Sequence, residues 1–222
     1  MYTLKILALA LVIGALSALA ASSASANYTI VPSAGEKAGG NLIGSQANAP
    51  NQLKLETDVG AVRCSTVKLE GELPNNTEAT LTVRPFFSTC FLAGVKATVS
   101  SPSCRFRFET PVTPTEAEPS LHAGVRILCS LGTSILIHDS VGLNCSISIG
   151  QQGPLNKVSF VNNAGGTVTA TFEVTGITYT DNGSCPSTEE KEETSVTGTY
   201  TGPVTFSGFS SSGTAAKELM VT

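Results

Sequence analysis

Six cysteines, set within a long series of alternating apolar and polar residues, constrain this chain more than any other feature of its sequence. An even number of cysteines in a chain of this size is typical of a disulfide framework. The alternative is a zinc site, but no two cysteines have the CxxC spacing of a zinc knuckle. The sequence therefore predicts three disulfides among Cys64, Cys90, Cys104, Cys129, Cys145 and Cys185.

Six cysteines can pair in fifteen ways, and sequence alone does not choose among them. Two of the intervals bracket short turns, and the cysteines in them fall on the apolar phase of the flanking segments. Cys104, for example, alternates with Phe106 and Phe108, so the three side chains share one face of a strand. On this basis we expect the disulfides Cys90–Cys104 and Cys129–Cys145 and, by elimination, Cys64–Cys185.

Alternation with a period of two continues through most of the chain, and no segment has a convincing helical period. The run from Asn162 to Gly166 predicts a hairpin turn, and a shift of the apolar phase at Gly176 predicts a bulge. We predict an all-β fold, an antiparallel β-sandwich or flattened barrel of about ten to twelve strands. A single domain over 52–222 is expected; the alternative is two small β units divided near the proline-containing segment 111–119.

Residues 1–26 have the three parts of a secretory signal peptide. Lys5 precedes an apolar run over 6–16, which is shorter than the about 20 residues needed to span a bilayer and so argues against a membrane anchor helix. Ala24, Ser25 and Ala26 supply the small residues of a cleavage site. We therefore expect a secreted, extracellular mature chain that starts at Asn27, has no transmembrane anchor, and begins with an irregular lead-in over 27–51.

The composition limits the classes of partner. The residues after 26 contain all 17 acidic side chains and all but one of the 13 basic ones, so the mature chain is acidic. This balance argues against a nucleic-acid partner. The absence of tryptophan and the low aromatic content, 6%, argue against a large aromatic ligand pocket.

The cysteine spacing and the strand pattern together resemble those of a known group of proteins. The similarity lies in Cys64, Pro85–Cys90, Cys104–Phe108, Cys129, Cys145–Ile149 and Tyr200–Gly202. In these segments the chain resembles uncharacterised secreted, six-cysteine all-β proteins of soil actinobacteria. The resemblance implies a disulfide-linked β fold. Because that group has no established activity, the resemblance implies no functional residue.

The arginines suggest one binding surface. All five lie between residues 63 and 126, and four of them fall on the polar phase of an expected strand: Arg84, Arg105, Arg107 and Arg126. Guanidinium groups suit phosphates and carboxylates, so an anionic cell-envelope polymer is a candidate partner. The alternative is an ordinary solvated sheet face with cross-strand pairs of arginine and glutamate.

The sequence contains no assembled catalytic motif, neither GxSxG nor HExxH. His138, Asp139 and Ser140 are contiguous, and neighbours on a strand point to opposite faces, so they do not form a triad. His122 lies on the polar phase of its segment, although a metal site of both histidines and a carboxylate stays an alternative. We predict no catalytic residue, metal ligand or cofactor.

The expected function is that of a secreted or cell-surface-associated, non-enzymatic structural or binding protein whose ligand the sequence does not name. The alternative is a secreted hydrolase that acts on envelope polysaccharide or peptide, with its acid, base and nucleophile on different strand ends.

Overall fold

The computed structural model describes residues 26–31, 37–49, 52–114, 120–182, 184–185, 194–212 and 215–222. These residues form strands, turns and loops without a helix, and all the strand pairings are antiparallel. The predicted all-β class is confirmed, and the arrangement is consistent with a sandwich or flattened barrel. The predicted signal peptide, apart from Ala26, lies outside the described residues. Within them we find no helix with the length and apolar character needed to cross a membrane.

The described residues contain fifteen strands, more than the about ten to twelve expected from the sequence. In chain order they are β1 (Tyr28–Val31), β2 (Gly40–Gln46), β3 (Lys54–Thr57), β4 (Gly60–Leu73), β5 (Thr77–Glu78), β6 (Leu81–Leu92), β7 (Val95–Ser100), β8 (Arg105–Phe108), β9 (Leu121–Leu128), β10 (Ile135–Asp139), β11 (Ser146–Ile149), β12 (Gln152–Asn163), β13 (Thr167–Asp181), β14 (Thr194–Phe209) and β15 (Ala216–Val221).

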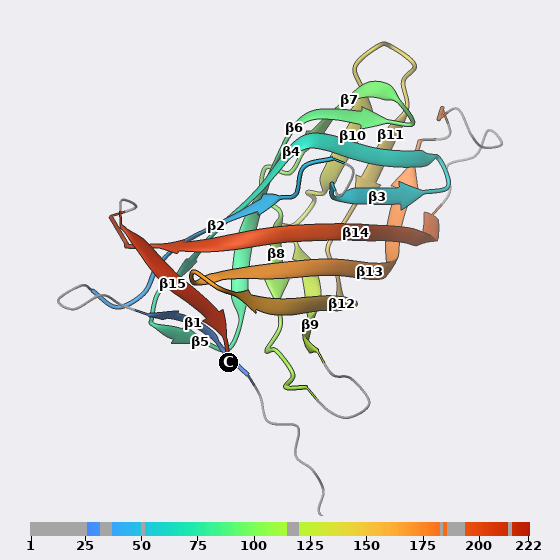
Figure 1. Cartoon of the computed structure of the whole chain (residues 1–222). Coiled ribbons are helices and arrows are strands. Elements are labelled where there is room, and N and C mark those ends of the chain that lie inside the picture. Colours follow the sequence, from blue (N-terminus) through green and yellow to red (C-terminus); the bar gives the residue numbers. More distant parts are fainter. Residues whose placement is uncertain are drawn as a thin grey trace, which may run out of the picture.

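Four long strands, β4, β6, β13 and β14, organise the molecule because each changes its partner partway along its length. At one end they pair with β2, β8 and β12, and β9 joins β8 to β12. At the other end they pair with β3, β7 and β11, and β10 joins β7 to β11. Together with the β4–β6 and β13–β14 ladders, each set closes a circuit of eight strands. Figure 1 shows β7, β10 and β11 at the opposite end of the molecule from β1, β5 and β15.

Glutamine side chains occupy two of the places where the strands diverge. Gln46, at the end of β2, donates from Nε2 to the Cys64 carbonyl at 2.8 Å and accepts from the Leu53 amide at 3.2 Å. Gln152, at the start of β12, donates to the Thr178 carbonyl and accepts from the Thr178 amide, both at 2.8 Å. Backbone polar groups that leave a ladder need new partners when they are shielded from water. The two side-chain amides supply those partners.

The interior at the β2, β8, β9 and β12 end is filled by aromatic rings, and we call this end the aromatic half. Phe108 is at its centre, with ring centroids 5.8 to 6.0 Å from those of Phe160, Phe172 and Phe206. Tyr28 extends the group through an edge contact with Phe160 at 5.7 Å. The edge and tilted orientations are those that aromatic pairs prefer. The end bordered by β3, β7, β10 and β11 has an interior of mainly aliphatic side chains with a few aromatic rings, described below, and we call it the cavity half.

The prediction of an irregular lead-in over 27–51 was wrong, because β1 and β2 lie within it and belong to the sheet. Their alternation is hidden by small residues. Gly44 occupies an inward position in β2, where a Cβ atom would lie 2.6 Å from the Phe206 ring. Glycine is required there by its neighbour, and it removes the apolar signal that would have marked the strand.

The local strand features are confirmed. β12 and β13 form the expected hairpin, and the β13–β14 register shifts between Val174 and Ile177, where Gly176 has a φ of 72°. The apolar phases of β6, β8 and β13 all point inward. Two leucines at this end of the sheet, Leu136 and Leu143, are exposed.

The six cysteines form three disulfides as expected, but the predicted pairing was wrong. The bonds are Cys64–Cys90, Cys104–Cys129 and Cys145–Cys185. The prediction assumed that cysteines flanking a turn face each other. The β6–β7 hairpin instead places Cys90 opposite Ala97, while the β4–β6 ladder places it opposite Cys64. Three intramolecular disulfides are typical of an oxidising, extracellular-type environment.

Candidate functional site

The four arginines singled out from the sequence lie on three adjacent strands, and we call them the arginine face. Arg84 is on β6, Arg105 and Arg107 are on β8, and Arg126 is on β9. Arg107 is directly opposite Arg126, and Val83 is opposite Phe106. The antiparallel register therefore brings the next residues, Arg84 and Arg105, side by side at the end of the β6–β8 ladder.

Two of these arginines, Arg107 and Arg126, share one carboxylate. Glu109 Oε1 lies 3.1 Å from Arg107 Nη2 and 2.5 Å from Arg126 Nε. Arg126 also donates from Nη1 to the Gly153 carbonyl at 3.0 Å. Burial of the Glu109 carboxyl raises its pKa, but the hydrogen bonds and charges of the two arginines outweigh that effect and hold the pKa below its ordinary value. This half of the arginine face matches the alternative of cross-strand arginine–glutamate pairs.

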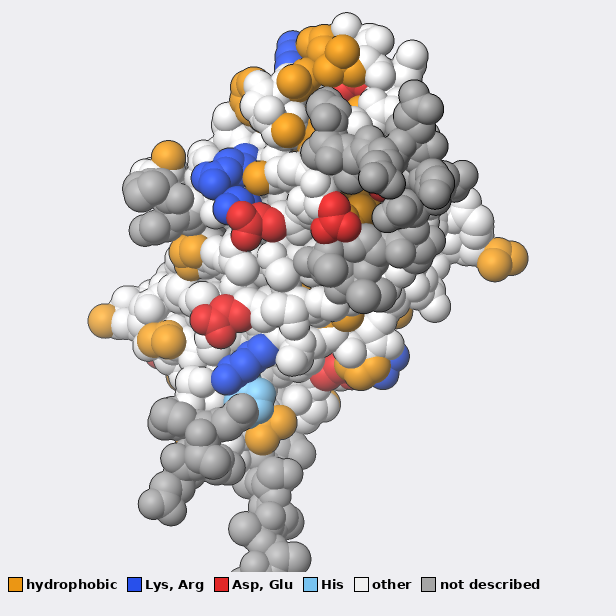
Figure 2. All heavy atoms as spheres, turned by 90° about the vertical axis from the view of Figure 1, so that its right-hand side faces the viewer, with side chains coloured by type: hydrophobic (Ala, Val, Ile, Leu, Met, Phe, Trp, Pro, Cys, Tyr) orange, Lys and Arg blue, Asp and Glu red, His pale blue; other side chains and the backbone are white. Residues whose placement is uncertain are grey.

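The other two arginines are available to a partner. Arg84 lies with its guanidinium carbon 5.2 Å from the centroid of the Phe86 ring, and it makes a long 3.5 Å contact to the Pro102 carbonyl. Arg105 is exposed and forms no salt bridge with the described residues. Glu70 is opposite Arg84 in the β4–β6 ladder and reduces the positive potential there. On the face shown in Figure 2, basic side chains likewise lie near acidic ones and form no continuous basic surface.

Of the contiguous His138, Asp139 and Ser140, Asp139 makes hydrogen bonds within its own loop. Asp139 accepts hydrogen bonds from the backbone amides of Val141, Leu143 and Cys145, at 2.8 to 3.0 Å. These bonds, that from Leu143 foremost, keep the pKa of Asp139 below its ordinary value. An aspartate held ionised by its own loop in this way is a loop-ordering residue rather than a partner for a catalytic histidine.

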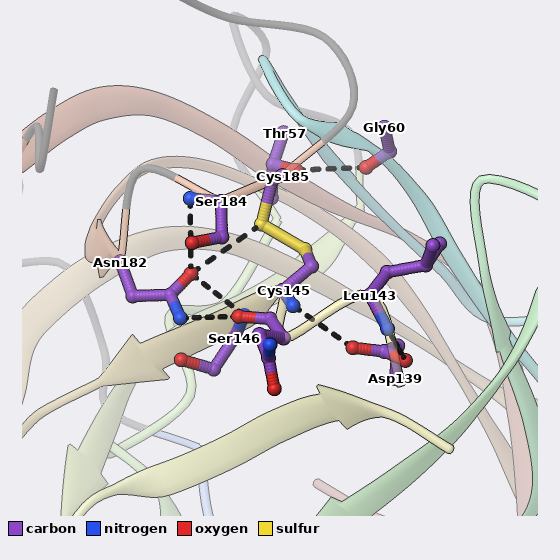
Figure 3. Close-up of a disulfide and its surroundings, with 10 residues drawn as sticks. Thr57, Gly60, Asp139, Leu143, Cys145, Ser146, Asn182, Ser184 and Cys185 are labelled. Atoms are coloured by element: carbon purple, nitrogen blue, oxygen red, sulfur yellow. Dashed lines mark hydrogen bonds between the residues drawn. A yellow bond between two sulfur atoms is a disulfide. The ribbon is translucent and has the colours of Figure 1, made fainter. Parts of the chain in front are cut away.

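The loop after β10 is also held by hydrogen bonds from Asn182, which directly follows β13, as Figure 3 shows. Asn182 accepts from the Ser146 amide at 3.0 Å and donates to the Asn144 carbonyl, next to the Cys145–Cys185 disulfide. Val141 and Leu143 nevertheless project outward, with 58% and 48% of their surface exposed. Figure 2 shows hydrophobic side chains gathered at this end of the molecule. The loop is thus an ordered, exposed apolar tip.

The two histidines lie on different strands, His122 on β9 and His138 on β10. His122 Nδ1 is 3.0 Å from the Ser120 carbonyl, and Nδ1 of His138 is buried without a hydrogen-bond partner in the described structure. Among the described residues no group of three histidine, cysteine or carboxylate side chains has a geometry suited to a metal ion.

The structure adds a feature that sequence reasoning missed, a cavity of about 70 Å³ inside the cavity half. Among the described residues that line it, which are mainly aliphatic and aromatic, Tyr200 on β14 is the one that carries a side-chain oxygen. Burial raises the pKa of that phenol, and its Oη has no hydrogen-bond partner among the described residues. The sequence signal was a tyrosine on the inward phase of a strand otherwise rich in threonine and glycine.

Comparisons of this chain with protein-family models, with curated proteins and with solved structures give no match.

Proposed function

We propose that this chain is a secreted or cell-surface-associated, non-enzymatic binding or structural protein, and that Arg84 and Arg105 contact an anionic polymer of the cell envelope. The export-signal pattern of residues 1–26 and the three disulfides support the location. The resemblance to secreted six-cysteine proteins of soil actinobacteria is part of the same proposal.

The observation that carries the binding role is the position of Arg84 and Arg105. Both side chains are exposed at the same end of the β6–β8 ladder, and neither has a salt bridge within the described structure. Two neighbouring guanidinium groups that face solvent can each form paired hydrogen bonds with a phosphate or carboxylate. A repeating anionic polymer would meet both groups at once, which favours it over a single small anion.

The test is retention of the protein on immobilised long-chain polyphosphate, with dextran as the uncharged control, at increasing salt. Retention should fall as salt rises, because exposed charges are screened over about 10 Å at 0.1 M ionic strength. The double variant Arg84→Ser with Arg105→Ser should lose most of the retention. Arg63→Ser is the matched control, since Arg63 is also exposed but lies on β4 opposite Phe91.

Retention of the double variant equal to that of the unmodified protein would contradict the arginine proposal. The hydrolase alternative has its own outcome. Turnover of an envelope polysaccharide or peptide by the purified protein, lost in His138→Ala or His122→Ala, would replace the non-enzymatic proposal.

A further inference from the structure

The turn between β9 and β10 presents a leucine to solvent. Leu131 is fully exposed, and we call residues 130–133 the leucine turn. The Ser130 carbonyl accepts hydrogen bonds from the Thr133 amide at 3.0 Å and from Thr133 Oγ1 at 2.7 Å, and Gly132 has a φ of 73°. A hydrogen bond between the first and last residues is typical of an ordered β-turn. Leu131 is therefore held in solvent by a fixed backbone.

The leucine turn is joined to the exposed half of the arginine face. Thr133 Oγ1 lies 2.5 Å from the Ser103 hydroxyl, and the Cys104–Cys129 disulfide links the same two segments next to this contact. Arg105 directly follows the first of these cysteines in the chain. One disulfide and one hydrogen bond thus keep Leu131 and Arg105 on the same fixed surface.

Two more apolar side chains are exposed on the outer face of the sheet beside this turn. Phe86 on β6 is 39% exposed, and Leu136, the second residue of β10, is 40% exposed. Strand β7 separates the two residues and pairs with both of their strands. The Arg84 guanidinium carbon lies 5.2 Å from the centroid of the Phe86 ring. Apolar and cationic groups are therefore interleaved over this surface.

Cations outnumber carboxylates around these apolar side chains. In the β4–β6 ladder Lys68 is opposite Phe86, and Glu70 is opposite Arg84. With Arg105, three exposed cations are accompanied by one exposed carboxylate. Exposed apolar groups beside an excess of cations are complementary to an anionic bilayer, where apolar groups enter the acyl boundary and cations meet headgroups. A second copy of the chain on this surface would instead bring the same cations together.

We propose that the leucine turn, with Arg84 and Arg105 beside it, docks the protein on an anionic phospholipid surface. Leu131 enters the boundary between headgroups and acyl chains, and the two guanidinium groups bind headgroup phosphates. Phe86 and Leu136 widen the apolar contact. The inference rests on the proposed role of the two arginines, and it goes beyond that role because it adds a lipid surface as the partner of Leu131.

The experiment measures sedimentation of the mature chain, from Asn27 onward, with vesicles of phosphatidylglycerol and with vesicles of phosphatidylcholine. Partition into phosphatidylglycerol vesicles should be at least about tenfold stronger and should fall as salt rises. Leu131→Ser should weaken it about five- to tenfold, because an apolar side chain no longer enters the membrane. Leu143→Ser is the matched control, since Leu143 is also exposed in a loop but lies at the tip of the cavity half, and it should leave partition unchanged.

Retention on polyphosphate separates this inference from the proposed function on which it rests. Polyphosphate has no acyl chains, so Leu131→Ser should leave that retention unchanged, whereas the double variant Arg84→Ser with Arg105→Ser should lose both retention and vesicle binding. A double variant that keeps its polyphosphate retention contradicts the proposed function. If the double variant loses retention but Leu131→Ser binds vesicles as the unmodified protein does, the lipid inference alone is wrong.

Two further measurements need only the unmodified protein. A lipid with a spin label in its acyl chain should broaden the methyl resonances of Leu131 in phosphatidylglycerol vesicles and leave those of Leu143 sharp. The reverse pattern would overturn the proposal, as would the absence of partition into phosphatidylglycerol vesicles. Sedimentation velocity without lipid should show a monomer; a dimer would assign the surface to a second copy if Leu131→Ser abolished it.

Discussion

The aromatic half and the cavity half share four strands but are held together by different means. The aromatic half is filled by rings around Phe108. The cavity half has an incompletely filled interior, yet Cys64 lines its cavity and the Cys145–Cys185 disulfide lies at its tip. The Cys104–Cys129 bond adjoins Phe106 and Ile127, which also line the cavity. The disulfides are therefore concentrated around the less densely packed cavity half. They stabilise the fold of that half although its interior contains an unfilled cavity.

The largest effect should come from removing a ring from the aromatic half. Phe108→Ala should cost about 3–5 kcal/mol of unfolding free energy, the range for large truncations in a packed core. Ile135→Ala, beside the existing cavity, should cost about 2 kcal/mol, because Ile135 already lacks neighbours on one side. Urea unfolding measures both, with Phe91→Ala, an exposed ring, as the control. Equal losses for Phe108→Ala and Ile135→Ala would remove the proposed difference in packing.

Loss of the disulfides should affect the cavity half first. Loops of 26, 25 and 40 residues are closed by the three bonds, and the chain-entropy estimate gives each about 3–4 kcal/mol. Amide hydrogen exchange after reduction should accelerate in β7, β10 and β11 before it does in β2 and β12. Simultaneous acceleration in both halves would show that the bonds stabilise the whole sheet equally.

A matched pair on one strand tests the cavity itself. Val168 and Val174 are both buried on the same face of β13, but only Val174 lines the cavity. Val174→Ile should be neutral or slightly stabilising because the added methylene enters free space. Val168→Ile should cost about 1–3 kcal/mol through overpacking. Thermal unfolding measures both variants. A lower melting temperature for Val174→Ile than for Val168→Ile would contradict the proposed difference in packing between the two halves.

The smallest effect is that of acid on the two carboxylates, Glu109 in the aromatic half and Asp139 at the tip of the cavity half. Both pKa values are lowered on folding, so both groups stabilise the folded state above their unfolded-state values, near 4.5 and 3.8. That contribution is lost as the pH falls through the lower folded-state values. Glu109→Gln should reduce the acid sensitivity of unfolding slightly, because partly exposed ion pairs contribute about 0–1 kcal/mol.

Asp139→Asn should act locally at the tip of the cavity half. The expected result is faster amide exchange at Val141, Leu143 and Cys145, with no change at Gly153 in the other half. Unchanged exchange at the three amides would show that Asp139 does not order its loop.

The alternation of apolar and polar residues was enough to predict which side chains of a strand point inward and where the strand has a bulge. The inward phases of β8 and β13, the bulge at Gly176 and the outward position of the arginines all follow from the alternation of neighbouring residues. Where glycine replaced an apolar side chain, as at Gly44, the same method missed the strand.

Features that depend on which strands become neighbours were not predictable in this way. Cys64 is opposite Cys90 because β4 pairs with β6 over a long ladder, which no local pattern specifies. Glu109 reaches Arg126 because β8 and β9 are adjacent. The unpaired hydroxyl of Tyr200 results from side chains contributed by many strands, so only the assembled interior reveals it.

The four shared strands have a consequence for how the molecule melts. Since β4, β6, β13 and β14 form part of the wall of both halves, the loss of any one of these four strands opens both circuits. The described part of the chain should therefore denature as one cooperative unit, in which the calorimetric enthalpy equals the van't Hoff enthalpy. Two interiors of unequal density would then have a single melting temperature, set by the strands that they have in common.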